Sequence, residues 1–121
     1  MSLKKRPTIL LIGNDTTLAY LLERFAERCE YKLDVNPEKP SAKDIKVINP
    51  AAIVFSSIEA LEIFQSLVEE LASLDFPIMV CSSIADEARA RELGADYCLL
   101  HPLIYDDFQT ALMNASSSKR L

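Results

Sequence analysis

Hydrophobic and polar positions along this chain form short apolar runs that alternate with longer segments of helical periodicity. Residues 7–12 form a continuous run rich in leucine and isoleucine that ends at Gly13, as expected for a strand buried on both faces of a parallel sheet. From Thr16 to Cys29, apolar residues recur at helical spacing with charged residues between them. The pattern predicts a strand followed by an amphipathic crossover helix.

Four further units of the same kind follow along the chain. We expect strands over residues 31–35, 51–55, 78–81 and 97–100, and helices after Ser41, along the apolar stripe 61–71, over 85–92 and over 105–114. Gly94 is predicted to cap the helix over 85–92. Five strand–helix units in succession predict an α/β fold with one open, doubly wound parallel sheet and helices on both faces.

Composition and charge narrow the function only slightly. The chain has 121 residues, which suits one domain, and its net charge of -5 with scattered basic residues argues against direct nucleic-acid binding. No apolar run is long enough to span a membrane, and no secretory signal is present, so we expect a cytoplasmic protein. Three widely separated cysteines are expected to be buried free thiols.

Any ligand of such a fold is expected at the carboxyl ends of the strands. The segments expected there are Gly13-Asn14-Asp15, Ser56-Ser57, Ser82-Ser83 and Leu100-His101-Pro102.

Two of these segments lie in stretches that resemble a known family. The stretches FPIMVCSS at 76–83 and ELGADYCLLHP at 92–102, together with the order of elements and the chain length, resemble the receiver domain of two-component response regulators, the CheY-like superfamily. The resemblance implies a flavodoxin-like fold with sheet order 2-1-3-4-5 and a cis peptide before Pro102. It places the domain at residues 7–115, with 1–6 as a disordered or expression-derived leader and 116–121 as a tail or linker to a missing segment.

The resemblance also implies a site at which this chain departs from the family. Receivers use an acidic pair that holds Mg²⁺, an aspartate nucleophile, a hydroxyl and a lysine, which together neutralise the phosphoryl group in transfer. The corresponding positions here are Gly13 and Asn14 for the acidic pair, with Asp15 one place further along, then Ser56 for the nucleophile, Ser82 for the hydroxyl and His101 for the lysine. The position of the aromatic switch falls on Cys98.

The spacing between these positions also differs from that of receiver domains. The loop after Ser56 is about four residues shorter than is usual, and the segment from Ser82 to Gly94 is shorter by roughly one helical turn, about 3.6 residues. We therefore expect no cofactor and no Mg²⁺ binding, with Asp15 as the one weak metal candidate.

Each polar position also has a structural interpretation. Ser56-Ser-Ile-Glu59 fits a capping box, and Ser83 and Asp15 stand at predicted helix starts. His101 is expected to be a hydrogen-bonded loop histidine, because no other ligand stands at metal spacing.

These observations favour a degenerate pseudo-receiver, which is not an enzyme and acts by protein–protein interaction without aspartyl phosphorylation. Its partner would be another protein or a further domain of a longer signalling chain, with at most a weak homodimer and no membrane contact. The resemblance places the interaction face at Glu87, Arg91, Tyr97, Asp106 and Gln109.

Two alternatives stay open. The strand ends could hold a small molecule in a flavodoxin-like binding module, although the chain has no glycine-rich phosphate loop. A small enzyme with Cys81 as nucleophile would need His101 as its base.

Overall fold

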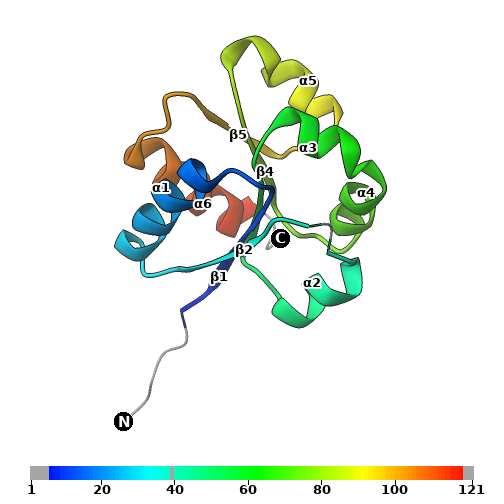
Figure 1. The fold of residues 1–121 in the computed structure, drawn as a ribbon, viewed down its shortest axis with the longest axis horizontal. Helices are drawn as coiled ribbons and strands as arrows, with labels where there is room; N and C mark the ends of the chain where they lie inside the picture. Colours follow the sequence, from blue (N-terminus) through cyan, green and yellow to red (C-terminus); the bar gives the residue numbers. More distant parts are fainter. Residues whose placement is uncertain (1–5, 39, 119–121) are drawn as a thin grey trace.

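The computed structural model describes residues 6–38 and 40–118, which form a parallel sheet with helices on both sides (Figure 1). The strands are β1 (Thr8–Ile12), β2 (Lys32–Asn36), β3 (Ala52–Phe55), β4 (Ile78–Ser82) and β5 (Tyr97–Leu100). The helices are α1 (Thr16–Arg28), α2 (Ala42–Ile48), α3 (Ile58–Ile63), α4 (Gln65–Ser73), the short 3-10 helix η1 (Ile84–Asp86), α5 (Glu87–Glu92) and α6 (Tyr105–Ser118). All neighbouring strands are parallel, and their order β2-β1-β3-β4-β5 confirms the predicted fold class and topology.

The sheet separates two hydrophobic cores. Ile9 and Leu11 of β1 face the core beneath α1 and α6, whereas Leu10 and Ile12 face the core beneath the other helices. Successive side chains of a strand point to opposite faces, so a strand buried on both sides must be apolar at every position. This explains the continuous apolar run over residues 7–12 and places α1 and α6 on one side of the sheet and α2 to α5 on the other (Figure 1).

The stripe over residues 61–71 is not one helix, as the sequence predicted, but two. The helix breaks at Phe64, which leaves helical geometry with φ -102° and ψ 32°. The side-chain amide of Gln65 donates to the carbonyl of Leu61 at 2.9 Å and to the carbonyl of Leu93 at 2.7 Å. This side chain therefore joins the break to the end of α5, a contact that periodicity within one segment cannot reveal.

Several element ends also differ from the prediction. The helix expected over 85–92 begins as η1, and α6 continues past Asn114 to Ser118. The start of the predicted tail 116–121 therefore belongs to a helix, while the leader residues 1–5 and the last residues 119–121 lie outside the described residues.

Of the three thiols expected to be buried, only Cys81 is, whereas the other two are partly exposed. Among the described helices, none is both long and apolar enough to cross a bilayer.

Candidate functional site

The carboxyl ends of β1 and β3 meet beside a shallow hollow. Ile12 and Phe55 are register partners, so Gly13 and Ser56 leave the two strands side by side. The Ser56 N–H donates to the carbonyl of Ile12 at 3.0 Å. The hollow has a volume of about 550 Å³ and is lined by Gly13, Asn14, Asp15, Thr16, Pro37, Ser56, Ser57, Glu59, Ala60, Ile63 and Phe64. The structure thus brings four of the predicted site positions together.

Gly13 and Ser56 are in very close contact. A Cβ at position 13 would lie 2.0 Å from the Oγ and 2.5 Å from the Cβ of Ser56, and Gly13 has a φ of +144°. Both distances are well below any real carbon contact, and side chains rarely adopt this backbone conformation. The position that holds an acidic residue in the family therefore has no room for any side chain in this chain.

Asp15 has a structural role at the start of α1. Its Oδ1 accepts a hydrogen bond from the Leu18 N–H at 3.0 Å and caps α1, in agreement with the structural interpretation. No three histidine, cysteine or acidic side chains converge within residues 6–38 and 40–118 as metal ligands would. Mg²⁺ prefers oxygen ligands and is usually held through one or two carboxylates, and of the two carboxylates that line the hollow, Asp15 and Glu59, the first already caps a helix.

The serine that caps α3 is Ser57, not Ser56 as the predicted capping box required. Ser57 Oγ accepts the Ala60 N–H at 3.1 Å, and Glu59 lies in the first turn. Ser56 Oγ has no hydrogen bond within the part of the chain that the structure describes. β3 ends at Phe55, as predicted, but α3 begins at Ile58, one residue later than the capping box required, and the cap moves with it.

Replacing Ser57 with alanine is expected to lower the free energy of unfolding by about 1 kcal/mol, because the Ala60 N–H loses its acceptor. Ser56→Ala is the matched control and should change it by less than about 0.5 kcal/mol. Urea unfolding followed by circular dichroism measures both. Equal losses in the two variants would contradict the assignment of the cap.

Ser82 ends β4 and His101 follows β5, and neither residue lines this hollow. The Ser82 side chain is buried, with only 6% of the residue exposed, and the backbone N–H of His101 donates to the Ser82 carbonyl at 3.1 Å. The peptide between His101 and Pro102 is cis, as the family resemblance implied. The imidazole is exposed and has no hydrogen bond to any described residue, so the prediction of a hydrogen-bonded loop histidine is wrong for the side chain.

Ser83 begins η1 without a side-chain bond to the backbone. Its Oγ donates to Asp86 Oδ2 at 3.3 Å instead. The predicted helix start is therefore correct in position, but the two side chains bond to each other and leave the backbone amides uncapped.

The pKa of the Cys81 thiol does not favour the alternative in which this cysteine is a nucleophile. Burial, with a smaller contribution from the charge of Asp15, raises the pKa of Cys81 to about 12. A thiol with this pKa stays protonated near neutral pH, whereas a nucleophilic cysteine needs the thiolate. Cys81 therefore fits a packed core residue.

The positions of the predicted interaction face are partly engaged with one another. Arg91 Nη2 lies 3.4 Å from Glu87 Oε2, and the Tyr97 hydroxyl donates to a backbone carbonyl of α6 at 3.1 Å. Asp106 and Gln109 are exposed on α6. All five lie on α5, β5 and α6, as the resemblance requires.

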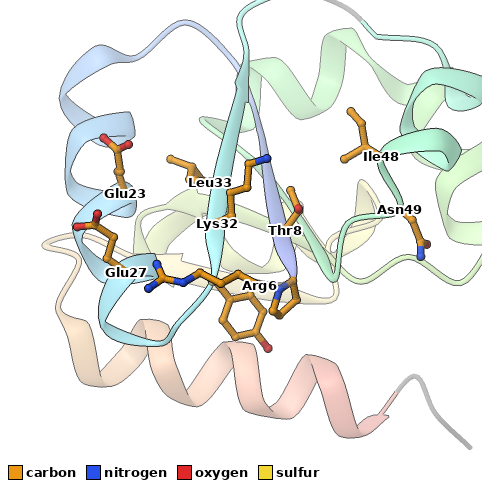
Figure 2. Close-up of a pocket in the computed structure, with 10 residues that line it drawn as sticks. Arg6, Thr8, Glu23, Glu27, Lys32, Leu33, Ile48 and Asn49 are labelled. Atoms are coloured by element: carbon orange, nitrogen blue, oxygen red, sulfur yellow. The ribbon is translucent and has the colours of Figure 1, made fainter. Parts of the chain in front are cut away.

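A larger hollow of about 820 Å³ lies at the opposite, amino end of the sheet. Figure 2 shows Glu23 and Glu27 on α1, with Arg6 beside Glu27, Lys32 on β2 and Asn49 on the far side of β1. It contains none of the predicted site residues, and its charged side chains are all exposed. Ligands of open parallel sheets bind at the carboxyl ends, so we do not assign the functional site here.

No family model and no curated protein matches this chain in sequence. Solved structures do match in fold. The N-terminal signal receiver domain of a response regulator from Bacteroides fragilis has a TM-score of 0.75 and 15% identity, over 94% of this chain and 99% of that one. A response regulator signal receiver domain from Bermanella marisrubri has a TM-score of 0.72 and 20% identity, over 92% and 98% of the two chains.

A third similar structure comes from a different kind of protein. A putative pilus assembly protein (cpaE) from Burkholderia thailandensis has a TM-score of 0.67 and 19% identity, over 93% of this chain and 99% of that one. At these identities the likeness establishes the fold, which is that of receiver domains.

Proposed function

We propose that this chain is a receiver-like domain of a two-component signalling protein that acts by protein–protein interaction without aspartyl phosphorylation. The chain would be a pseudo-receiver, with no enzymatic activity of its own and no bound Mg²⁺. Its partner would be another protein or a further domain of a longer signalling chain.

The contact between Gly13 and Ser56 is the observation that carries this proposal. A receiver needs a carboxylate at each of these positions, and here one position has a serine while the other has no space for a side chain. Serine cannot form the acyl phosphate that a receiver passes on, and the nearby Asp15 carboxylate caps a helix. The serine in place of an acceptor carboxylate and the lack of space for a metal-binding side chain at Gly13 therefore support the same proposal.

Beryllofluoride, a mimic of the phosphoryl group, tests the proposal directly. We expect that titration of Mg²⁺ and beryllofluoride into the protein leaves the amide NMR signals of residues 13–15, 56–57 and 82–83 unchanged, because the described residues contain no cluster of three metal-ligating side chains and Gly13 has no space for a carboxylate. A receiver domain with an intact acidic pair serves as the positive control. Saturable, Mg²⁺-dependent shifts at these residues would overturn the proposal.

The partner surface that we propose is the face formed by α5, β5 and α6. It carries both signs of charge, which suits specific pairing more than large hydrophobic burial.

A second candidate function is small-molecule binding in the hollow at the strand ends. The volume of about 550 Å³ is the observation that favours it, because drug-sized ligands occupy sites of roughly 300–1,000 Å³. The walls include Asn14, Asp15 and Glu59 beside Ile63, which suits a ligand with a hydrogen-bonding or cationic group. Saturable, Mg²⁺-independent shifts of residues around this hollow in a ligand screen would favour this function.

A further inference from the structure

Helices α2 and α4 lie next to each other on one side of the sheet (Figure 1). A surface groove is lined by residues of both. The groove has a volume of about 500 Å³ and is lined by Ala42, Lys43, Lys46, Val47, Glu70, Ser73 and Leu74. It lies away from the strand ends and away from the face formed by α5, β5 and α6.

The groove exposes two large apolar side chains. Val47 is 82% exposed, more than any other large hydrophobic residue in the described part of the chain, and Leu74 is 41% exposed. Single exposed apolar residues are common, but these two line the same hollow. Covering both would remove apolar surface from water.

The two walls of the groove carry opposite charges. Lys43 and Lys46 are exposed on α2, and Glu70 is exposed on α4. Only two ion pairs exist among residues 6–38 and 40–118, Arg89 with Glu62 and Arg91 with Glu87. The charges of the groove are therefore left unpaired within the described chain.

The same spacing of residues recurs on both walls. Apart from Ala42, the lining residues follow the spacing i, i+3 and i+4, namely Lys43, Lys46 and Val47 on α2, and Glu70 and Ser73 on α4 with Leu74 just after its end. Such positions share one side of a helix. Helix α2 leads into β3 and α4 leads into β4, and these strands are parallel, so the two helices run in the same direction. The apolar lining residue, Val47 or Leu74, lies toward the carboxyl end of its helix in both cases.

This arrangement is complementary to itself. In a two-fold dimer, residue i of one copy contacts residue j of the other, and j contacts i. A two-fold axis along the groove would place Val47 against Leu74 of the second copy and the lysines of α2 against the second copy's Glu70. A rotation about this axis exchanges the two walls of the groove but leaves each residue at the same height along it. Each contact would therefore form twice in the dimer.

We propose that two copies of this chain associate through the α2–α4 groove, with Val47 and Leu74 at the centre and Lys43, Lys46 and Glu70 as the flanking charges. The association is independent of whether the strand-end site accepts a phosphoryl group. It uses a different surface from the face of α5, β5 and α6, so both surfaces can bind at the same time.

Sedimentation velocity across protein concentrations of about 10 µM to about 1 mM tests the proposal, since a small interface of this kind is expected to be weak. The average mass of the wild type should rise from 13.5 kDa toward twice this value. Val47→Glu should weaken the association at least about tenfold by placing a charge against an apolar residue. Ile84→Glu is the matched control, because Ile84 is 74% exposed but lines neither the groove nor the strand-end hollow, and it should associate like the wild type.

Charge reversal tests the two-fold geometry itself. Lys43→Glu combined with Lys46→Glu makes both walls acidic, and Glu70→Lys makes both walls basic, so each variant alone should lose self-association. Mixing the two variants should restore a dimer, because every acidic wall then meets a basic one.

Three results would each overturn the proposal. The wild type could stay monomeric across the whole concentration range, Val47→Glu could associate as the wild type does, or the two charge-reversed variants could fail to form a mixed dimer. Unchanged thermal unfolding of the variants verifies that they are folded, which is expected because the substituted residues are exposed.

Discussion

Replacing Gly13 with alanine is expected to lower the free energy of unfolding by roughly 3 kcal/mol. One part of the loss comes from the backbone, because Gly13 has a φ of +144° that a residue with a Cβ rarely adopts. The other part is steric, because the new methyl group would lie 2.5 Å from the Cβ of Ser56. Denaturant unfolding of the variant against the wild type measures the sum.

A double-mutant cycle separates the two parts. In a Ser56→Gly background the atoms that clash are absent, so only the backbone cost of Gly13→Ala should remain, and the coupling between the sites should be about 1–2 kcal/mol. Ser56→Ala is not sufficient, because it keeps the Cβ. If alanine at position 13 cost the same in both backgrounds, the close approach of the two strand ends would be wrong.

Replacing Phe55 with alanine is expected to lower the free energy of unfolding by about 4 kcal/mol. Phe55 is fully buried at the end of β3, and its ring centroid lies 6.3 Å from that of Phe64 at the break between α3 and α4. The truncation would leave a cavity beneath this break. Urea or thermal unfolding gives the size of the loss.

Two controls accompany this measurement. Phe55→Leu keeps most of the volume and should cost less than about 1.5 kcal/mol. Ile63→Ala removes a comparable apolar group at a position that is 72% exposed, so its effect should stay within about 0.5 kcal/mol. A loss below about 1 kcal/mol for Phe55→Ala would show that Phe55 does not pack as described.

The proposed lack of a phosphoryl site also predicts that single substitutions will not create one. An aspartate introduced at position 56 would supply an acceptor but not the missing acidic pair, and a carboxylate at position 13 would clash with residue 56. Since the two positions constrain each other, we expect that recovery of Mg²⁺ binding requires a change in the backbone between β1 and α1 as well.

The sequence by itself determined the alternation of strands and helices. A strand has a side-chain period of two and a helix one of 3.6, so buried runs such as 7–12 and amphipathic stretches such as 16–29 can be recognised locally. The resemblance to receiver domains added the order of the strands. The periodicity and the resemblance together located the strand ends at Gly13 and Ser56. Helix starts such as Ser41 were also readable, because its side chain bonds to the amide of Asp44 only three residues away.

Only the tertiary structure decided what depends on contacts between distant segments. The break at Phe64 is accompanied by a bond from Gln65 to Leu93, and the lack of space at Gly13 depends on Ser56 of another strand. The exposure of Val47 beside Leu74 likewise depends on how α2 and α4 are placed on the sheet. Residue patterns encode local periodicity, but such contacts are set by strand register and helix packing, which no single segment contains.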